Sequence, residues 1–110
     1  MNKLLVTTAV SAILVGTTHA QRPELLVTMG QLSVTGGIAE QAVAVKNNSG
    51  KPIRLLWIEC SFLGANGDLL SDGLASITNL PPGDIGYVSP KTPHGEGATR
   101  AVCRVSSVRH

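Results

Sequence analysis

The chain has 110 residues and a formal net charge of +2 at pH 7, from 9 Lys and Arg against 7 Asp and Glu. A charge balance this small excludes an electrostatic argument for binding nucleic acid or an anionic membrane surface. The length allows one domain, and because only 3% of the residues are aromatic, its modest core must be built from aliphatic side chains. A covalent cross-link would add stability to a domain with such a modest core.

Residues 1–20 have the pattern of a secretion signal. Lys3 supplies a positive charge near the start, residues 4–15 form an uncharged apolar run, and small residues lie one and three positions before a cleavage point after Ala20. The alternative, a membrane anchor, is disfavoured because the run is shorter than the roughly 20 residues that span a bilayer. We therefore expect a cleaved signal helix, no later membrane insertion, and a nearly neutral mature domain at residues 21–110 in the periplasm or outside the cell.

The remainder of the chain has no sustained helical periodicity. Short β-branched and apolar runs alternate with clusters of Gly, Pro and Asn, which predicts an all-β domain. We expect residues 47–52 to form a hairpin turn and residues 89–97 an irregular loop. The predicted strands, in chain order, are 25–27, 32–34, 42–45, the central strand 53–63, a return strand that starts at 69, 85–88 and 98–108.

Cys60 and Cys103 both follow the signal, and in an oxidising compartment such a pair predicts a disulfide. Neither belongs to a CxxC pair or lies close to a histidine, which disfavours metal ligands and a reactive thiol. The pair is 43 residues apart, and cross-linking such a loop stabilises a domain by about 4 kcal/mol through lost chain entropy. Because side chains alternate along a strand, each cysteine shares an apolar face, with Leu56, Ile58 and Phe62 in one strand and Ala101 and Val105 in the other.

The opposite faces of the same two strands carry charges. Glu59 lies opposite Cys60 in its strand, and Arg100 and Arg104 lie opposite Cys103. If the strands are neighbours, Glu59 can pair with either arginine. An exposed pair contributes less than about 1 kcal/mol, so its expected role is to favour one strand register.

Turn sequences between residues 43 and 88 suggest a family. They are VAVKNNSGK at 43–51, Asn66-Gly67 after the strand that contains Trp57, and LPPGD at 80–84 before Tyr87. In this respect the chain resembles the FxLYD-type domain of small bacterial envelope proteins. The resemblance implies a single immunoglobulin-like antiparallel β-sandwich with no catalytic residue and no cofactor. Residues 60–64 depart from the family pattern, because they lack its leading Phe, its Tyr and its Asp.

The sequence offers only fragments of an active site. His94 lies in a loop beside Glu96, but a zinc site needs three or four converging ligands. There is no G-x-S-x-G nucleophile motif, and neither the spaced oxygen ligands nor the glycine pairs match calcium or phosphate loops. We therefore expect no enzyme activity, no metal and no cofactor. A small secreted hydrolase or metal-binding protein centred on the His94 loop is the alternative.

Trp57 is the most informative single side chain. Strict alternation places Ile53, Leu55 and Trp57 on the face opposite Cys60. If the Cys60 face is the core, these three side chains form an exposed apolar patch, which marks a partner surface. The alternative is that residues 24–34 or edge loops cover it. The predicted function is a non-catalytic module that binds another envelope protein or supports envelope assembly.

Overall fold

The computed structural model describes residues 24–110, so the predicted signal at 1–20 lies outside the described residues. Within the described part the regular secondary structure is entirely β, as predicted. The strands are β1 (Leu25–Thr35), β2 (Ile38–Asn47), β3 (Ile53–Leu63), β4 (Leu69–Leu80), β5 (Ile85–Val88), β6 (Lys91–Thr92) and β7 (Arg100–Arg109).

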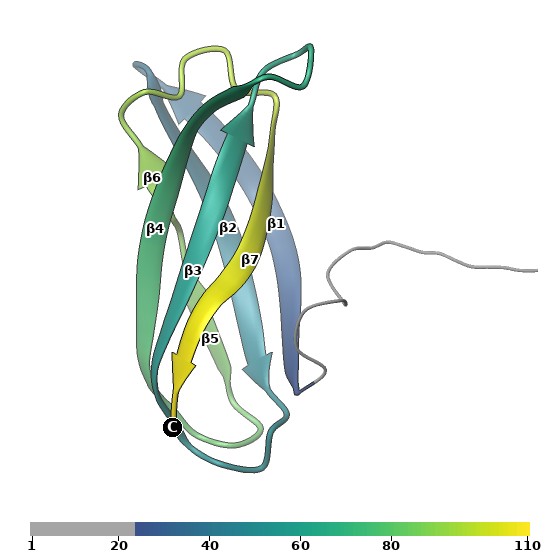
Figure 1. Cartoon of the computed structure of the whole chain (residues 1–110), viewed down its shortest axis with the longest axis vertical. Helices are drawn as coiled ribbons and strands as arrows, with labels where there is room; N and C mark the ends of the chain where they lie inside the picture. The colour runs from purple at the N-terminus through teal and green to yellow at the C-terminus, as the bar shows by residue number, and fades with distance from the viewer. Residues whose placement is uncertain (1–23) are drawn as a thin grey trace, which may run out of the picture.

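The strands form two antiparallel sheets that pack face to face as a β-sandwich (Figure 1). One sheet has the order β1-β2-β5, with β6 also paired to β2, and the other has the order β4-β3-β7. β2 pairs with β5 and β3 pairs with β7, which is how strands B and E and strands C and F pair in immunoglobulin-like sandwiches. The strand predicted to be central is β3, and it has the predicted bounds.

The two short strands predicted near the start are one long strand, β1. A bulge between Met29 and Leu32 accounts for the break in the pattern, because two β1 residues there oppose the single residue Ala42. The buried Gln41 side chain holds this bulge by donating from Nε2 to the Gly30 and Ala42 carbonyls, each at 2.9 Å. The bulge therefore extends the strand instead of ending it.

The hairpin predicted at residues 47–52 is wrong, because β2 and β3 belong to different sheets and the segment arches between them. The fully buried Asn47 side chain holds the arch. Its Nδ2 donates to the Lys51 carbonyl at 2.7 Å and to the Leu80 carbonyl at 3.0 Å, and its Oδ1 accepts from the Ser49 backbone N–H at 3.0 Å. These bonds join the arch to the end of β4.

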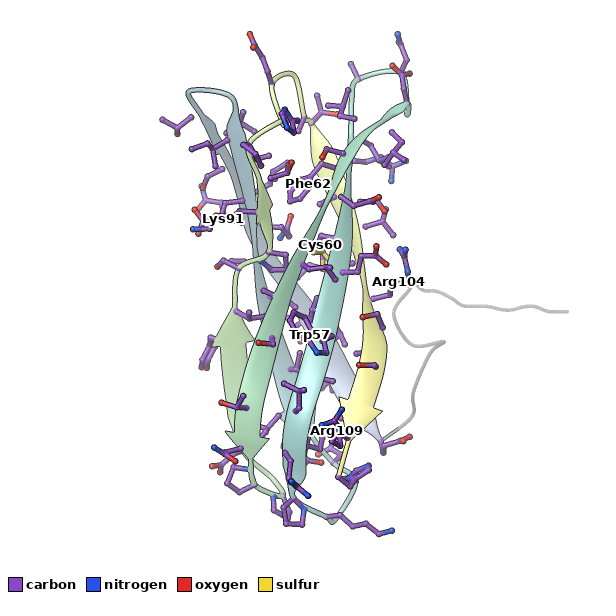
Figure 2. The ribbon with its side chains drawn as sticks, turned by 60° about the vertical axis from the view of Figure 1, so that its left-hand side comes forward. Trp57, Cys60, Phe62, Lys91, Arg104 and Arg109 are labelled. Carbon is purple, nitrogen blue, oxygen red and sulfur yellow. A yellow bond between two sulfur atoms is a disulfide. The ribbon has the colours of Figure 1, made fainter. Side chains whose placement is uncertain are left out.

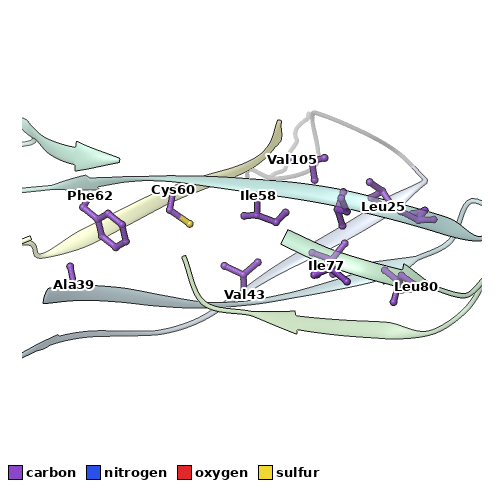
Figure 3. Packing of buried hydrophobic residues seen from close by; sticks show 12 residues of the cluster. Leu25, Ala39, Val43, Ile58, Cys60, Phe62, Ile77, Leu80 and Val105 are labelled. Atoms are coloured by element: carbon purple, nitrogen blue, oxygen red, sulfur yellow. The ribbon is translucent and has the colours of Figure 1, made fainter. Parts of the chain in front are cut away.

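The predicted apolar face of β3 forms the middle of the core (Figure 3). Leu56, Ile58, Cys60 and Phe62 are each 0% exposed, and β7 contributes the buried Val105. Because these β3 residues lie two positions apart, they confirm a regular strand over this stretch. The other core residues are Leu25, Ala39, Val43, Val45, Ile53, Ile77 and Leu80.

The predicted Cys60–Cys103 disulfide is present. The two residues are direct partners in the β3–β7 register, with their Cα atoms 4.0 Å apart. The bond therefore joins neighbouring strands of one sheet. It fixes the last strand to the central strand and does not tie the two sheets together.

Candidate interaction surface

The outer face of the β4-β3-β7 sheet carries Trp57 on its middle strand. Trp57 is 37% exposed and lies between Ser76 on β4 and Ser107 on β7. Leu55 lies half-buried beside it on β3, and Leu74 on β4 is 57% exposed. We refer to Leu55, Trp57 and Leu74 as the Trp57 surface.

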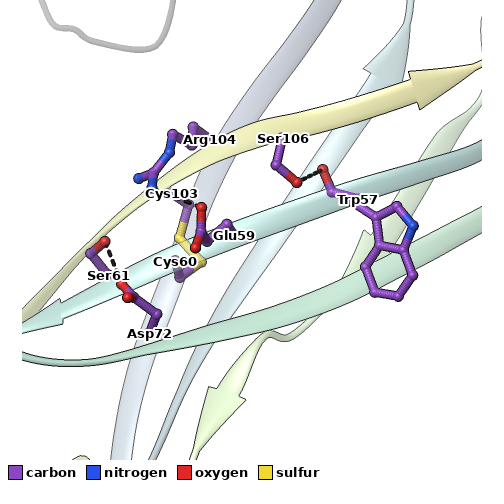
Figure 4. A network of polar contacts seen from close by, with 8 residues as sticks. All are labelled: Trp57, Glu59, Cys60, Ser61, Asp72, Cys103, Arg104 and Ser106. Carbon is purple, nitrogen blue, oxygen red and sulfur yellow. Dashed lines mark hydrogen bonds and ion pairs between the residues drawn. A yellow bond between two sulfur atoms is a disulfide. The ribbon is translucent and has the colours of Figure 1, made fainter.

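Two polar pairs lie next to the Trp57 surface (Figure 4). Arg104 Nη2 donates to Glu59 Oε1 at 2.7 Å across the β7–β3 pairing, which is one of the two pairings that the sequence left open. Ser61 Oγ donates to Asp72 Oδ1 at 2.8 Å across the β3–β4 pairing. These contacts link all three strands of the sheet on its outer side and set their side chains in one register.

Ile53 is not part of this surface, so its predicted place there is wrong. It is 0% exposed and packs in the core, as does Leu80, its partner on β4. The reason is a matched break in alternation, in which Arg54 and Asn79 lie opposite each other and both are exposed. Asn79 adopts a φ of 55°, a left-handed conformation that is rare outside glycine.

The alternative in which residues 24–34 cover this surface is also wrong. Those residues form most of β1, which belongs to the other sheet of the sandwich. Leu25 packs in the core, and Leu32 packs against it. The start of the described chain therefore completes the core between the two sheets and leaves the Trp57 surface exposed.

A second apolar area lies on the outer face of the other sheet. Tyr87 on β5 is 78% exposed and pairs with Ala44 on β2. The small side chains of Ala42 and Ala44 leave a shallow groove of about 480 Å³ beside Tyr87, with Thr28 on its β1 side. This area has no charged side chain among its lining residues.

The ends of β3, β4 and β7 form a third feature, which sequence reasoning missed. An open pocket of about 320 Å³ is lined by Arg54, Leu55, Thr78, Asn79 and Arg109. The sequence separates these residues widely, and its alternation pattern points Arg54 toward the core. The sequence does not reveal the left-handed conformation of Asn79, because no glycine lies next to it.

His94 is exposed in the loop between β6 and β7. Its backbone N–H donates to Thr92 Oγ1 at 3.1 Å, and Thr92 Oγ1 also lies 2.8 Å from Ser71 Oγ. Across residues 24–110, no three His, Cys, Asp or Glu side chains gather in a way that suits a metal ion. These contacts fix the loop backbone against β4.

Comparisons with protein-family models, curated proteins and solved structures found no match. The FxLYD resemblance and the secretion signal therefore stay predictions. Among residues 24–110, no helix has the length and apolar character to cross a bilayer.

Proposed function

We propose that the chain is a non-catalytic β-sandwich module that binds another envelope protein through the Trp57 surface. The observation that carries the proposal is an exposed tryptophan on the middle strand of a sheet. Tryptophan is among the residues that contribute most to protein interfaces, and such residues cluster near the interface centre. Trp57 is 37% exposed, and its neighbour Leu74 is 57% exposed.

The surroundings of Trp57 support a protein partner. The Glu59–Arg104 and Ser61–Asp72 contacts hold charged and polar groups in place beside the apolar side chains. An apolar centre with a polar rim is the usual anatomy of a protein–protein interface. Because the rim contacts already exist within the sheet, little side-chain order has to be gained on binding.

The proposed location is the periplasm or the outside of the cell. The signal pattern at residues 1–20 supports it, and a Cys60–Cys103 disulfide is compatible with an oxidising compartment. Envelope proteins are then the partners that the chain meets.

Site-specific photo-crosslinking in the producing cells tests the proposal. A photoreactive phenylalanine analogue at position 57 should give a discrete protein adduct, and the same analogue at position 87 should not. Tyr87 is the matched control, because it is an exposed aromatic residue on the other sheet. Adducts at both positions, or at neither, would contradict the proposal.

A second substitution sharpens the test. Leu74→Asp places a charge on the Trp57 surface and should abolish the adduct formed at position 57. Ile85→Asp, at a residue 48% exposed on the other sheet, should leave the adduct unchanged. An adduct that survives Leu74→Asp would show that the crosslink does not report docking on this surface.

A further inference from the structure

Two arginines line the pocket at the ends of β3, β4 and β7. Arg54 comes from β3 and Arg109 from β7, and Thr78 and Asn79 of β4 complete the wall. Figure 2 shows Arg109 further along the molecule than Trp57, toward the end of the sandwich where β7 terminates. Leu55 belongs both to the pocket and to the Trp57 surface, so the two features are continuous.

Arg54 is in the pocket because both strands change their alternation at the same point. Ile53 and Leu80 turn into the core, which leaves Arg54 and Asn79 outside beside Leu55 and Thr78. A left-handed asparagine costs free energy, and such conformations persist where the surrounding structure imposes them. The result is an arginine that faces solvent next to a second arginine.

Among residues 24–110, no acidic side chain forms an ion pair with Arg54 or Arg109. In residues 24–110 the ion pairs are Glu59–Arg104 and Glu40–Lys91, and no acidic side chain lines the pocket. Arg104 on the same sheet differs from these two arginines, because it donates a hydrogen bond to Glu59 at 2.7 Å. Two like charges in one pocket repel each other, whereas an oxyanion placed between them would accept charge-assisted hydrogen bonds from both.

We infer that this pocket binds a carboxylate of an acidic segment of the protein partner, an inference that rests on the proposed function. The pocket opens beside Leu55, so a ligand that carries the anion also lies over apolar side chains of the Trp57 surface. A peptide segment with an acidic residue next to an apolar residue fits both features. The Thr78 hydroxyl and the Asn79 amide supply further donors for the same carboxylate.

NMR titration of the purified domain tests the inference with two probes, glutarate and inorganic phosphate, at constant ionic strength. Glutarate should give saturable shifts of the Thr78 and Asn79 amide signals. Because a tenfold change in affinity is about 1.4 kcal/mol and a charge-assisted hydrogen bond is worth about that much, Arg54→Gln and Arg109→Gln should each weaken binding about tenfold.

Arg100→Gln is the matched control. Arg100 is an exposed arginine on the same strand as Arg109 and lies outside the pocket. The Arg100→Gln variant should therefore bind glutarate as tightly as the unchanged protein does. Shifts that do not saturate, or an equal loss in Arg100→Gln, would overturn the inference. Phosphate binding about tenfold tighter than glutarate would also overturn it, because the pocket would then suit a phosphate group.

The titration contains no partner protein, so its outcome is independent of the crosslinking result. A crosslink at position 57 together with no glutarate binding would overturn the carboxylate pocket and leave the proposed function standing. Glutarate binding without a crosslink would overturn the proposed function and the partner as the source of the carboxylate, and it would leave a pocket that binds carboxylates. Unchanged unfolding midpoints of the glutamine variants would show that they are folded, as expected for substitutions at exposed side chains.

Discussion

The two sheets of the sandwich differ in the contacts that hold their strands in place. In the β4-β3-β7 sheet, the Cys60–Cys103 disulfide and the Glu59–Arg104 pair join β3 to β7 at adjacent positions of the register. The β1-β2-β5 sheet has no covalent link in the described residues. The buried Gln41 amide holds the bulge in β1, and the buried Asn47 amide at the end of β2 donates to Leu80 of the other sheet. The sheet with the cross-link is also the one that carries the Trp57 surface.

The apolar areas on the outer faces of the two sheets also differ, in the charged and polar groups beside them. The Trp57 surface lies beside the Glu59–Arg104 ion pair and the arginine pocket, whereas no charged side chain lines the groove beside Tyr87. The Glu40–Lys91 ion pair of that sheet lies outside the groove. Binding surfaces with directional polar groups need a fixed backbone, because misplaced donors lose affinity. The Cys60–Cys103 disulfide therefore stabilises the sheet that carries the Trp57 surface, which we propose as the binding surface.

Removing the disulfide should cause the largest loss of stability. The double substitution Cys60→Ala with Cys103→Ala should lower the free energy of unfolding by about 4 kcal/mol, because the unfolded chain regains the entropy of a 43-residue loop. Replacing both residues avoids a free thiol. Urea denaturation followed by circular dichroism measures the change, and an unchanged midpoint would contradict the stabilising role of the bond.

The second largest loss of stability should come from removing the contacts that join the arch after β2 to the end of β4. Asn47→Ala removes the donor for the Lys51 and Leu80 carbonyls, and buried groups without a partner cost about 1–3 kcal/mol each, so we expect a loss of about 3 kcal/mol. Asn48→Ala is the control, because this neighbouring side chain is exposed and should change stability by less than about 0.5 kcal/mol. Equal effects at both positions would contradict the account of the arch.

The smallest effect is that of the ion pair beside the disulfide. A double-mutant cycle of Glu59→Gln and Arg104→Gln should give a coupling free energy below about 1 kcal/mol, since the pair is partly exposed. The coupling should fall further in about 1 M salt, where screening acts within about 3 Å. A coupling of several kcal/mol, insensitive to salt, would show that the pair does more than fix the register.

Sequence periodicity predicted well where the strands are regular. The bounds of β3, the core face with Cys60 and Phe62, and the Glu59–Arg104 contact all follow from alternation of side chains along strands that pair directly. The disulfide also needed little more than two cysteines on apolar faces. These features depend on residues close in sequence or on a single strand pairing.

The features that sequence missed depend on contacts between distant segments. Asn47 reads as a turn residue, but its role is set by the Leu80 carbonyl, 33 positions further along the chain. Alternation places Ile53 on the outer face because it assumes a regular strand, and the left-handed Asn79 opposite Arg54 breaks that assumption. The arginine pocket depends on the same break, so it could not be predicted either.

The Trp57 surface is open in the folded protein. Trp57 is the only tryptophan of the chain, so its fluorescence reports on this surface alone. Acrylamide should quench the native protein efficiently, with a quenching constant that approaches that of the urea-unfolded chain, because the side chain is 37% exposed. A native emission that resists quenching would show that Trp57 is covered, and it would contradict both the proposed surface and the docking that depends on it.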